Sequence, residues 1–239
     1  MNKKLLTLVL VLGMNTVHAW SEGIALLTLA DNYNTRGIIC NRDPVLQGFF
    51  DASLSNGLGL IIFENIDLTD IAGNRNKVTE LDIIPTYTVS LENDNKIVLG
   101  AAQYTFPNTT YPDTYELFGK FVNPNYNATY WYDVKEINSW YSSVSLTPMY
   151  NINSLFDIGA VGTVGYAGEG YNKGYFGVGE NAFNDLTTGL WLSLTKGNIV
   201  TTVSAGYIYL LDEEVREGAE EWYGKGETST LTVSLMYMF

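Results

Sequence analysis

The chain has 239 residues and a formal net charge of −13, which argues against nucleic acid as a partner because nucleic-acid binding rests on basic patches. Its single cysteine, Cys40, excludes an internal disulfide. Its single histidine, His18, lies in a segment that we expect to be removed, so the sequence favours neither a His-dependent hydrolase nor a His-ligated metal site, and we expect no enzyme activity, cofactor or metal.

The first 19 residues have the pattern of an export signal. Lys3 and Lys4 form a short positive region, residues 5–13 are apolar, and Val17-His18-Ala19 is a small-x-small cleavage site. The apolar run is much shorter than the roughly 20 residues of a membrane helix. We therefore predict a signal peptide over residues 1–19 and an exported domain over residues 20–239.

Strand-like segments follow one another through the rest of the chain, with no linker that would divide it into domains. Twelve such segments can be distinguished, an even number of the kind that bacterial single-chain barrels use. They cover residues 23–35, 44–54, 58–66, 78–91, 96–106, 114–122, 127–135, 140–150, 156–167, 184–195, 198–211 and 228–239. Pro85 and Pro148 cannot donate to a strand ladder, so each predicts a bulge or a weakened pairing.

The connections between these segments alternate in length. After even-numbered segments they are short and rich in Asn, Asp and Gly, as tight reversals require. After odd-numbered segments they are longer, with the exception of the short connection at residues 136–139. A lectin-like sandwich has no reason to alternate in this way. The pattern predicts an all-β fold, a transmembrane antiparallel up-and-down β-barrel of about twelve strands with both termini on the periplasmic side.

The first two segments carry a motif that resembles the opening of the TorF-like porin family of proteobacterial outer-membrane β-barrels. The matching residues are Tyr33, Arg36, Gly37, Ile38, Pro44, Gln47, Gly48 and Asp51. The chain departs from the motif at Asn32, where the family has an acidic residue, and at Thr35, where it has Phe. The resemblance implies a channel in the bacterial outer membrane, and it does not indicate which solute passes.

Period-two alternation assigns an inner and an outer face to several segments. In residues 81–91, Leu81, Ile83 and Tyr87 would face outward, and Glu80, Asp82 and Thr86 would face inward. Segments 58–66 and 96–106 are too uniformly apolar for an assignment. The residues that we predict to line the lumen and to select solutes are Arg36, Gln47, Asp51, Glu80, Asp82, Glu116, Lys120, Asp133, Lys135 and Asp157.

Acidic residues outnumber basic ones in this set, so a continuous pathway would favour cations. The alternative is that the interior charges pair and plug a narrow lumen. A buried arginine is more stable when it is paired, so we expect Arg36 to contact Asp31 or Asp51, either to fix strand register or to select solutes.

The two longest loops differ in composition. Residues 212–227 hold seven carboxylates and only Arg216 and Lys225 to offset them, which favours a solvated acidic loop over a divalent-cation site. The glycine-rich residues 168–179 predict a flexible external loop that folds over the pore. Aromatic residues near strand ends, Tyr33, Phe63 and Tyr104 among them, fit interfacial girdles or a simple strand preference equally well.

The last segment alternates strictly and ends on an aromatic residue. Leu231, Val233, Leu235, Tyr237 and Phe239 share one face, as expected of a strand that meets lipid. We predict that Tyr237 and Phe239 form a signal for membrane assembly. The expected partners are outer-membrane lipids and lipopolysaccharide, the barrel assembly machinery and small solutes.

These observations favour an outer-membrane channel for passive diffusion of small cationic or neutral solutes. The alternative is a structural or adhesion barrel that acts through its long acidic external loops. The sequence leaves the oligomeric state and the transported solute open.

Overall fold

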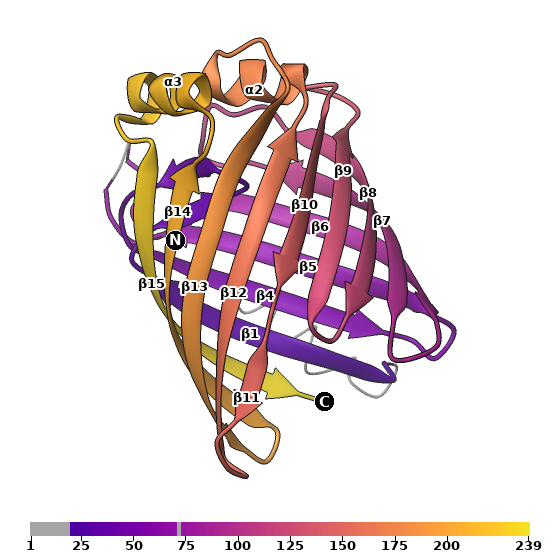
Figure 1. Cartoon of the computed structure of the whole chain (residues 1–239). Coiled ribbons are helices and arrows are strands. Elements are labelled where there is room, and N and C mark those ends of the chain that lie inside the picture. The colour runs from indigo at the N-terminus through magenta and orange to yellow at the C-terminus, as the bar shows by residue number, and fades with distance from the viewer. Residues whose placement is uncertain (1–19, 71–72) are drawn as a thin grey trace.

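A computed structural model of the protein describes residues 20–70 and 73–239, which form a closed antiparallel barrel (Figure 1). The wall strands are β1 (Glu22–Ala30), β4 (Val45–Ser53), β5 (Leu58–Asp67), β6 (Lys77–Ser90), β7 (Lys96–Thr105), β8 (Thr114–Asn123), β9 (Tyr126–Asp133), β10 (Trp140–Leu146), β11 (Met149–Asn151), β12 (Phe156–Ala167), β13 (Ala182–Lys196), β14 (Ile199–Leu210) and β15 (Glu227–Met238). The sheet closes because β10 pairs with both β9 and β12. The predicted signal peptide, residues 1–19, lies outside the described residues.

The predicted transmembrane barrel of about twelve strands is confirmed. The described sheet has thirteen strands, but β10 and β11 pair in succession with β12 and therefore occupy one position in the wall. The interruption falls at Pro148, as predicted, because proline has no N–H for the ladder. Pro85 acts more weakly, since Ile84 and Pro85 have no partners in the β6–β7 pairing although the register continues unchanged beyond them.

The two faces of the wall differ as a membrane barrel requires. On β15, Leu231, Val233 and Leu235 point outward and are about half exposed. Small hydroxyl residues face inward and bond across strands, as Thr28 does with Ser234 at 2.9 Å. An apolar outer face and a polar inner face are what a lipid-embedded barrel needs. Neither helix in residues 20–70 and 73–239 is long and apolar enough to cross a bilayer.

The structure also assigns faces to the two segments that alternation left open. The inner face of β7 includes Tyr104, and the inner face of its neighbour β8 includes Glu116 and Phe118. This part of the inner wall therefore carries both apolar and polar side chains. A cluster of Ile84, Ala102, Tyr104 and Phe118 packs there with Ile61 and Trp131 beside it. Residues of β5 and β7 are therefore apolar on both faces, which is why alternation could not be read from them.

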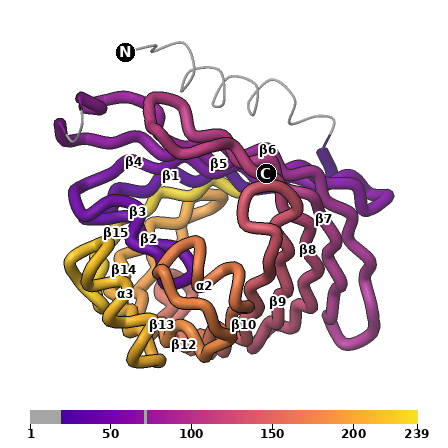
Figure 2. Tube along the Cα trace, turned by 90° about the horizontal axis from the view of Figure 1, so that it is seen from above, coloured from indigo at the N-terminus to yellow at the C-terminus, as the bar shows by residue number. Residues whose placement is uncertain are grey.

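The long connections are partly folded. Residues 23–35 were predicted as one strand, but β1 ends at Ala30, and β2 (Tyr33–Thr35) and β3 (Ile38–Asn41) form a separate hairpin. The loops predicted to be flexible or merely solvated contain helices α2 (Glu169–Phe176) and α3 (Glu213–Tyr223). Seen from above, β2, β3 and α2 lie inside the ring of wall strands (Figure 2).

Helix α3 shows why the acidic loop folds. The Asp212 side chain accepts a hydrogen bond from the Val215 N–H at 3.1 Å, and Glu213 and Glu214 occupy the first turn, where the helix dipole favours negative charge. Val215 and Ala219 are fully buried while the carboxylates face solvent. Asp212 thus caps the helix, the other carboxylates keep its outer face in solvent, and Val215 and Ala219 pack its inner face against the barrel.

Cysteine labelling tests which end of the barrel faces the exterior. Both helices lie at one end (Figure 1), and Lys173 and Glu217 are exposed there. In a Cys40→Ala background, Lys173→Cys and Glu217→Cys should react in intact cells with a bulky maleimide that cannot cross the outer membrane. Asn125→Cys, in the short turn after β8, and Lys196→Cys, at the end of β13, lie at the opposite rim and should react only after the membrane is permeabilised. The reverse pattern would contradict the predicted orientation.

Candidate functional site

A two-residue turn places Arg36 inside the barrel. Arg36 and Gly37 join β2 to β3 with φ values of +48° and +79°, so both central residues of the turn are left-handed. Such turns favour Asn-Gly, and an arginine there costs about 1–2 kcal/mol relative to its ordinary conformations. The conformation of the turn therefore gives no reason for arginine, instead of asparagine, at this position.

The side chain of Arg36 accounts for it. Its two terminal nitrogens donate to the two carboxylate oxygens of Glu116, at 2.8 and 2.9 Å. Nη2 also lies 3.2 Å from the Tyr104 hydroxyl, which donates to Glu116 at 2.8 Å. Glu116 is on β8, which lies four positions from β4 and five from β1 in the twelve-position ring of strands. The hairpin between β1 and β4 therefore reaches across the lumen and binds the far wall.

Aromatic rings surround the guanidinium group. Its central carbon lies 4.9 Å from the Trp131 ring centroid and 5.9 Å from the centroids of Tyr104 and Tyr141. We call Tyr104, Glu116, Trp131 and Tyr141 the Arg36 cage. Burial by itself would lower the pKa of Arg36, but Glu116 together with Tyr104 and Tyr171 outweighs burial and raises the pKa, so the group stays charged.

Other buried carboxylates lie near the cage on the inner wall. Asp133 accepts from the Thr114 hydroxyl at 2.7 Å and from the backbone N–H groups of residues 135–137. Asp185 accepts from the Tyr141 hydroxyl at 2.8 Å. Glu80 is buried beside Tyr33. Asp82 is only 4% exposed, and its Oδ1 has no hydrogen-bond partner. The inner wall thus holds more carboxyl groups than Arg36 can pair with.

Helices α2 and α3 close the lumen above the cage. The Tyr171 hydroxyl donates to the Arg36 carbonyl at 3.0 Å, and Tyr171 and Phe176 are buried with Val215 in one apolar cluster. The two helices approach closely at Gly218, where an added Cβ would stand 2.0 Å from the Phe176 carbonyl oxygen. The glycine-rich loop therefore covers the pore, as the sequence predicted, but as an ordered, packed lid.

The remaining predicted residues occupy three other regions. Asp51 and Lys120 face the lumen nearer the short turns, whereas Gln47 faces it near the long connections, where it donates to Asn65 at 3.1 Å. Within the described residues no ion pair of 4.0 Å or less joins Asp51 to Lys120. Asp157 lies at the rim of the short turns and accepts from Asn151.

Lys135 is not on the inner wall. It follows the end of β9 in the connection to β10, where it lies 3.5 Å from Glu136, and its side chain is 44% exposed. The predicted segment ended two residues too late, because the Asp133 carboxylate binds the next backbone N–H groups and turns the chain.

The expected partners of Arg36 were also wrong. Asp31 accepts from the Leu231 N–H at 2.9 Å, and the cation binds Glu116 in place of Asp31 or Asp51. The hairpin carries Arg36 away from the first two strands, which the sequence could not indicate.

The sequence does not predict the aromatic residues of the cage. Tyr104, Tyr33 and Phe63 fit either an interfacial girdle or a simple strand preference, but the rings of Tyr33 and Phe63 lie 5.8 Å apart inside the barrel and Tyr104 is buried, so a girdle is wrong for these three. One signal in the sequence was available, because residues separated by two positions on a strand face the same side of the wall. Trp131 lies two residues before Asp133 and Tyr104 pairs with Asp82, and both of these carboxylates had been assigned to the inner face.

Solved structures share this fold. The KdgM porin aligns with a TM-score of 0.54 at 12% identity, covering 91% of this chain and 99% of that chain. The NanC porin aligns with a TM-score of 0.52 at 12% identity, covering 90% and 97%. A KdgM porin in complex with disordered oligogalacturonate gives a TM-score of 0.52 at 11% identity, covering 91% and 99%. At these identities the similarity shows the porin-type barrel and nothing finer.

No family model matches the chain, and no curated protein sequence matches it. Membership of the TorF-like porin family therefore stays a prediction. Among residues 20–70 and 73–239, no group of three or more His, Cys, Asp or Glu side chains is arranged to hold a metal ion.

Proposed function

We propose that the protein is an outer-membrane channel of a Gram-negative bacterium that allows passive diffusion of small cationic or neutral solutes. The observation that carries this proposal is an acidic inner wall in a closed lipid-facing barrel whose lumen is crossed by the β2–β3 hairpin. The ion pair that joins this hairpin to the far wall, between Arg36 and Glu116, is a contact that can be released. A barrel with no transport role would be filled more stably by apolar side chains than by buried carboxylates.

The charge of the wall supports cations over anions. Glu80, Asp82 and Asp185 are buried on or beside the inner face, with Arg36 the cation nearest to them. Each wall carboxyl group that is ionised raises the local concentration of cations. One solved structure of similar fold is a KdgM porin in complex with oligogalacturonate, a polyanion. An acidic wall disfavours that class of solute here.

Conductance across a planar lipid bilayer tests the proposal. The folded protein, reconstituted in 1 M KCl, should produce discrete conductance steps, at least as brief openings of the hairpin. If neither the wild-type protein nor a variant without the Arg36 side chain produces steps, the channel proposal fails. A structural or adhesion barrel acting through α2 and α3 would then be the better interpretation.

Neutralising two carboxylates tests the selectivity. At pH 10 and 0.1 M salt, the double variant Glu80→Gln/Asp82→Asn should bring the cation-to-anion permeability ratio closer to one, because it removes ionised carboxylates from the inner wall. The change should nearly vanish at 1 M salt, where the screening length falls from about 10 Å to about 3 Å. Reversal potentials across a salt gradient measure the ratio.

The matched control is Glu213→Gln/Glu214→Gln, which removes the same charge from the exposed first turn of α3. That control should alter the ratio less than the inner-wall variant. Equal effects of the two double variants would show that the inner-wall carboxylates do not set selectivity.

A further inference from the structure

The Arg36 cage holds a guanidinium group that the protein supplies from its own hairpin. We propose that the cage is a recognition site for solutes that carry a guanidinium group, and that Arg36 occupies it as an internal stand-in until such a solute displaces it. This inference rests on the proposed channel function, because it names the class of solute that the channel admits.

The geometry of the cage fits a guanidinium better than an ammonium group. Glu116 accepts two parallel N–H bonds, at 2.8 and 2.9 Å, which requires a planar fork of donors. The Trp131 ring lies 4.9 Å from the central carbon, and an aromatic face attracts a weakly hydrated flat cation strongly. An ammonium group is a compact point charge. It can approach an aromatic face, but it lacks the planar fork of donors that the two oxygens of Glu116 require.

A second feature of the site points to a ligand from outside. Asp82 lies directly across the β6–β7 ladder from Tyr104 of the cage, and both residues face inward. Its Oδ1 is buried and receives no hydrogen bond from the described chain. A buried acceptor without a donor is costly, so the inner wall beside the cage is incompletely satisfied. A solute with additional N–H donors could supply the missing bond.

The strained turn supports the same conclusion. Arg36 has a φ of +48°, a conformation that costs asparagine less energy than arginine, so asparagine at this position would preserve the turn. A hairpin that only blocked the lumen would not require arginine at this turn position. An arginine at this point provides a cation that matches the cage and that competes with an incoming one.

Calorimetry on the folded, detergent-solubilised full chain tests the site without relying on conduction. Methylguanidinium chloride is the probe, and Arg36→Asn keeps the turn while it empties the cage. We expect Arg36→Asn to bind methylguanidinium at least about tenfold more tightly than the wild-type protein, because the internal competitor is gone. Methylammonium should bind this variant at least about tenfold more weakly than methylguanidinium.

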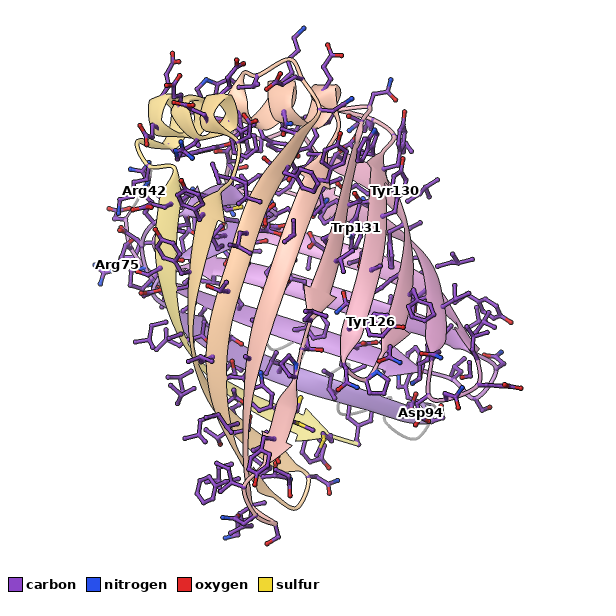
Figure 3. The ribbon with its side chains drawn as sticks, viewed as in Figure 1. Arg42, Arg75, Asp94, Tyr126, Tyr130 and Trp131 are labelled. Carbon is purple, nitrogen blue, oxygen red and sulfur yellow. The ribbon has the colours of Figure 1, made fainter. Side chains whose placement is uncertain are left out.

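The matched control is Arg42→Asn, which removes an exposed arginine from the other end of β3 and should bind like the wild type. Arg42 and Arg75 lie at the outer edge of the barrel (Figure 3). Adding Glu116→Gln to Arg36→Asn should abolish the gain in affinity. If that double variant does not fold, Trp131→Leu in the same background should reduce the gain instead.

Equal binding by the wild type and Arg36→Asn, or equal affinity for the two probes, would overturn the proposed site. The two proposals fail separately. Conductance steps without methylguanidinium binding would contradict the recognition site and leave the channel intact. Binding without conductance steps in either protein would contradict the channel and leave a guanidinium-binding barrel.

Discussion

Replacement of Arg36 by asparagine should raise the time-averaged conductance of the barrel about tenfold or more. The variant loses a bidentate ion pair with Glu116 and the contact with Tyr104, which hold the hairpin across the lumen. Hydrogen bonds to charged groups contribute about 1.5–3 kcal/mol, and every 1.4 kcal/mol changes an equilibrium tenfold, so the open population should grow accordingly. Single-channel recording in a planar bilayer measures the open probability.

The control for this experiment is Arg42→Asn, which makes the same change of charge outside the lumen. Its conductance should equal that of the wild type. If Arg36→Asn leaves the open probability unchanged, the hairpin is held by its packing against Tyr171 and Leu210, and the ion pair has no gating role.

The second large effect is expected at the end of the chain. Phe239→Asp should lower the amount of folded protein in the outer membrane several-fold, since losses of 1–2 kcal/mol change protein abundance by that much. The Phe239 ring lies 5.9 Å from Phe50 and 6.3 Å from Tyr237, and its backbone exchanges two 3.0 Å hydrogen bonds with Gly23. The substitution also removes the aromatic ending that we predict the assembly machinery to bind.

Membrane fractionation with a heat-modifiability assay, which separates folded from unfolded barrels, gives the result. Leu155→Asp places the same charge at an exposed apolar residue in the turn between β11 and β12 and should be tolerated. Normal outer-membrane levels of Phe239→Asp would refute the role of the terminal aromatic residue.

The wall of the barrel was predictable because it depends on local pattern. Tyr87 and Thr86 alternate in the sequence as they do across the wall, and Asn-rich turns mark where strands reverse. The last predicted segment, residues 228–239, differs from β15 by a single residue at each end. Period two and turn composition are enough to place such elements.

The interior was not predictable in the same way. The contact between Arg36 and Glu116 joins residues far apart in the sequence, and nothing near Arg36 indicates which wall it will reach. Helix α2 is only two turns long and contains Gly170 and Gly174, so propensity argues against it. Its stability comes from Tyr171 and Phe176, whose apolar contacts form only when the barrel is closed.

The pairing of the first wall strand with the last has a consequence for biogenesis. Leu27 of β1 pairs with Leu235 of β15, so the seam joins two segments from opposite ends of the chain. Every other contact in the wall joins strands that are neighbours in the sequence or nearly so. Hairpins between neighbouring strands can therefore form early, because they close only short loops. Pairing β1 with β15 closes the longest loop, so it costs the most conformational entropy and must come last. Until then β1 and β15 are open edges, and any chaperone that protects this protein during export has those two strands to cover.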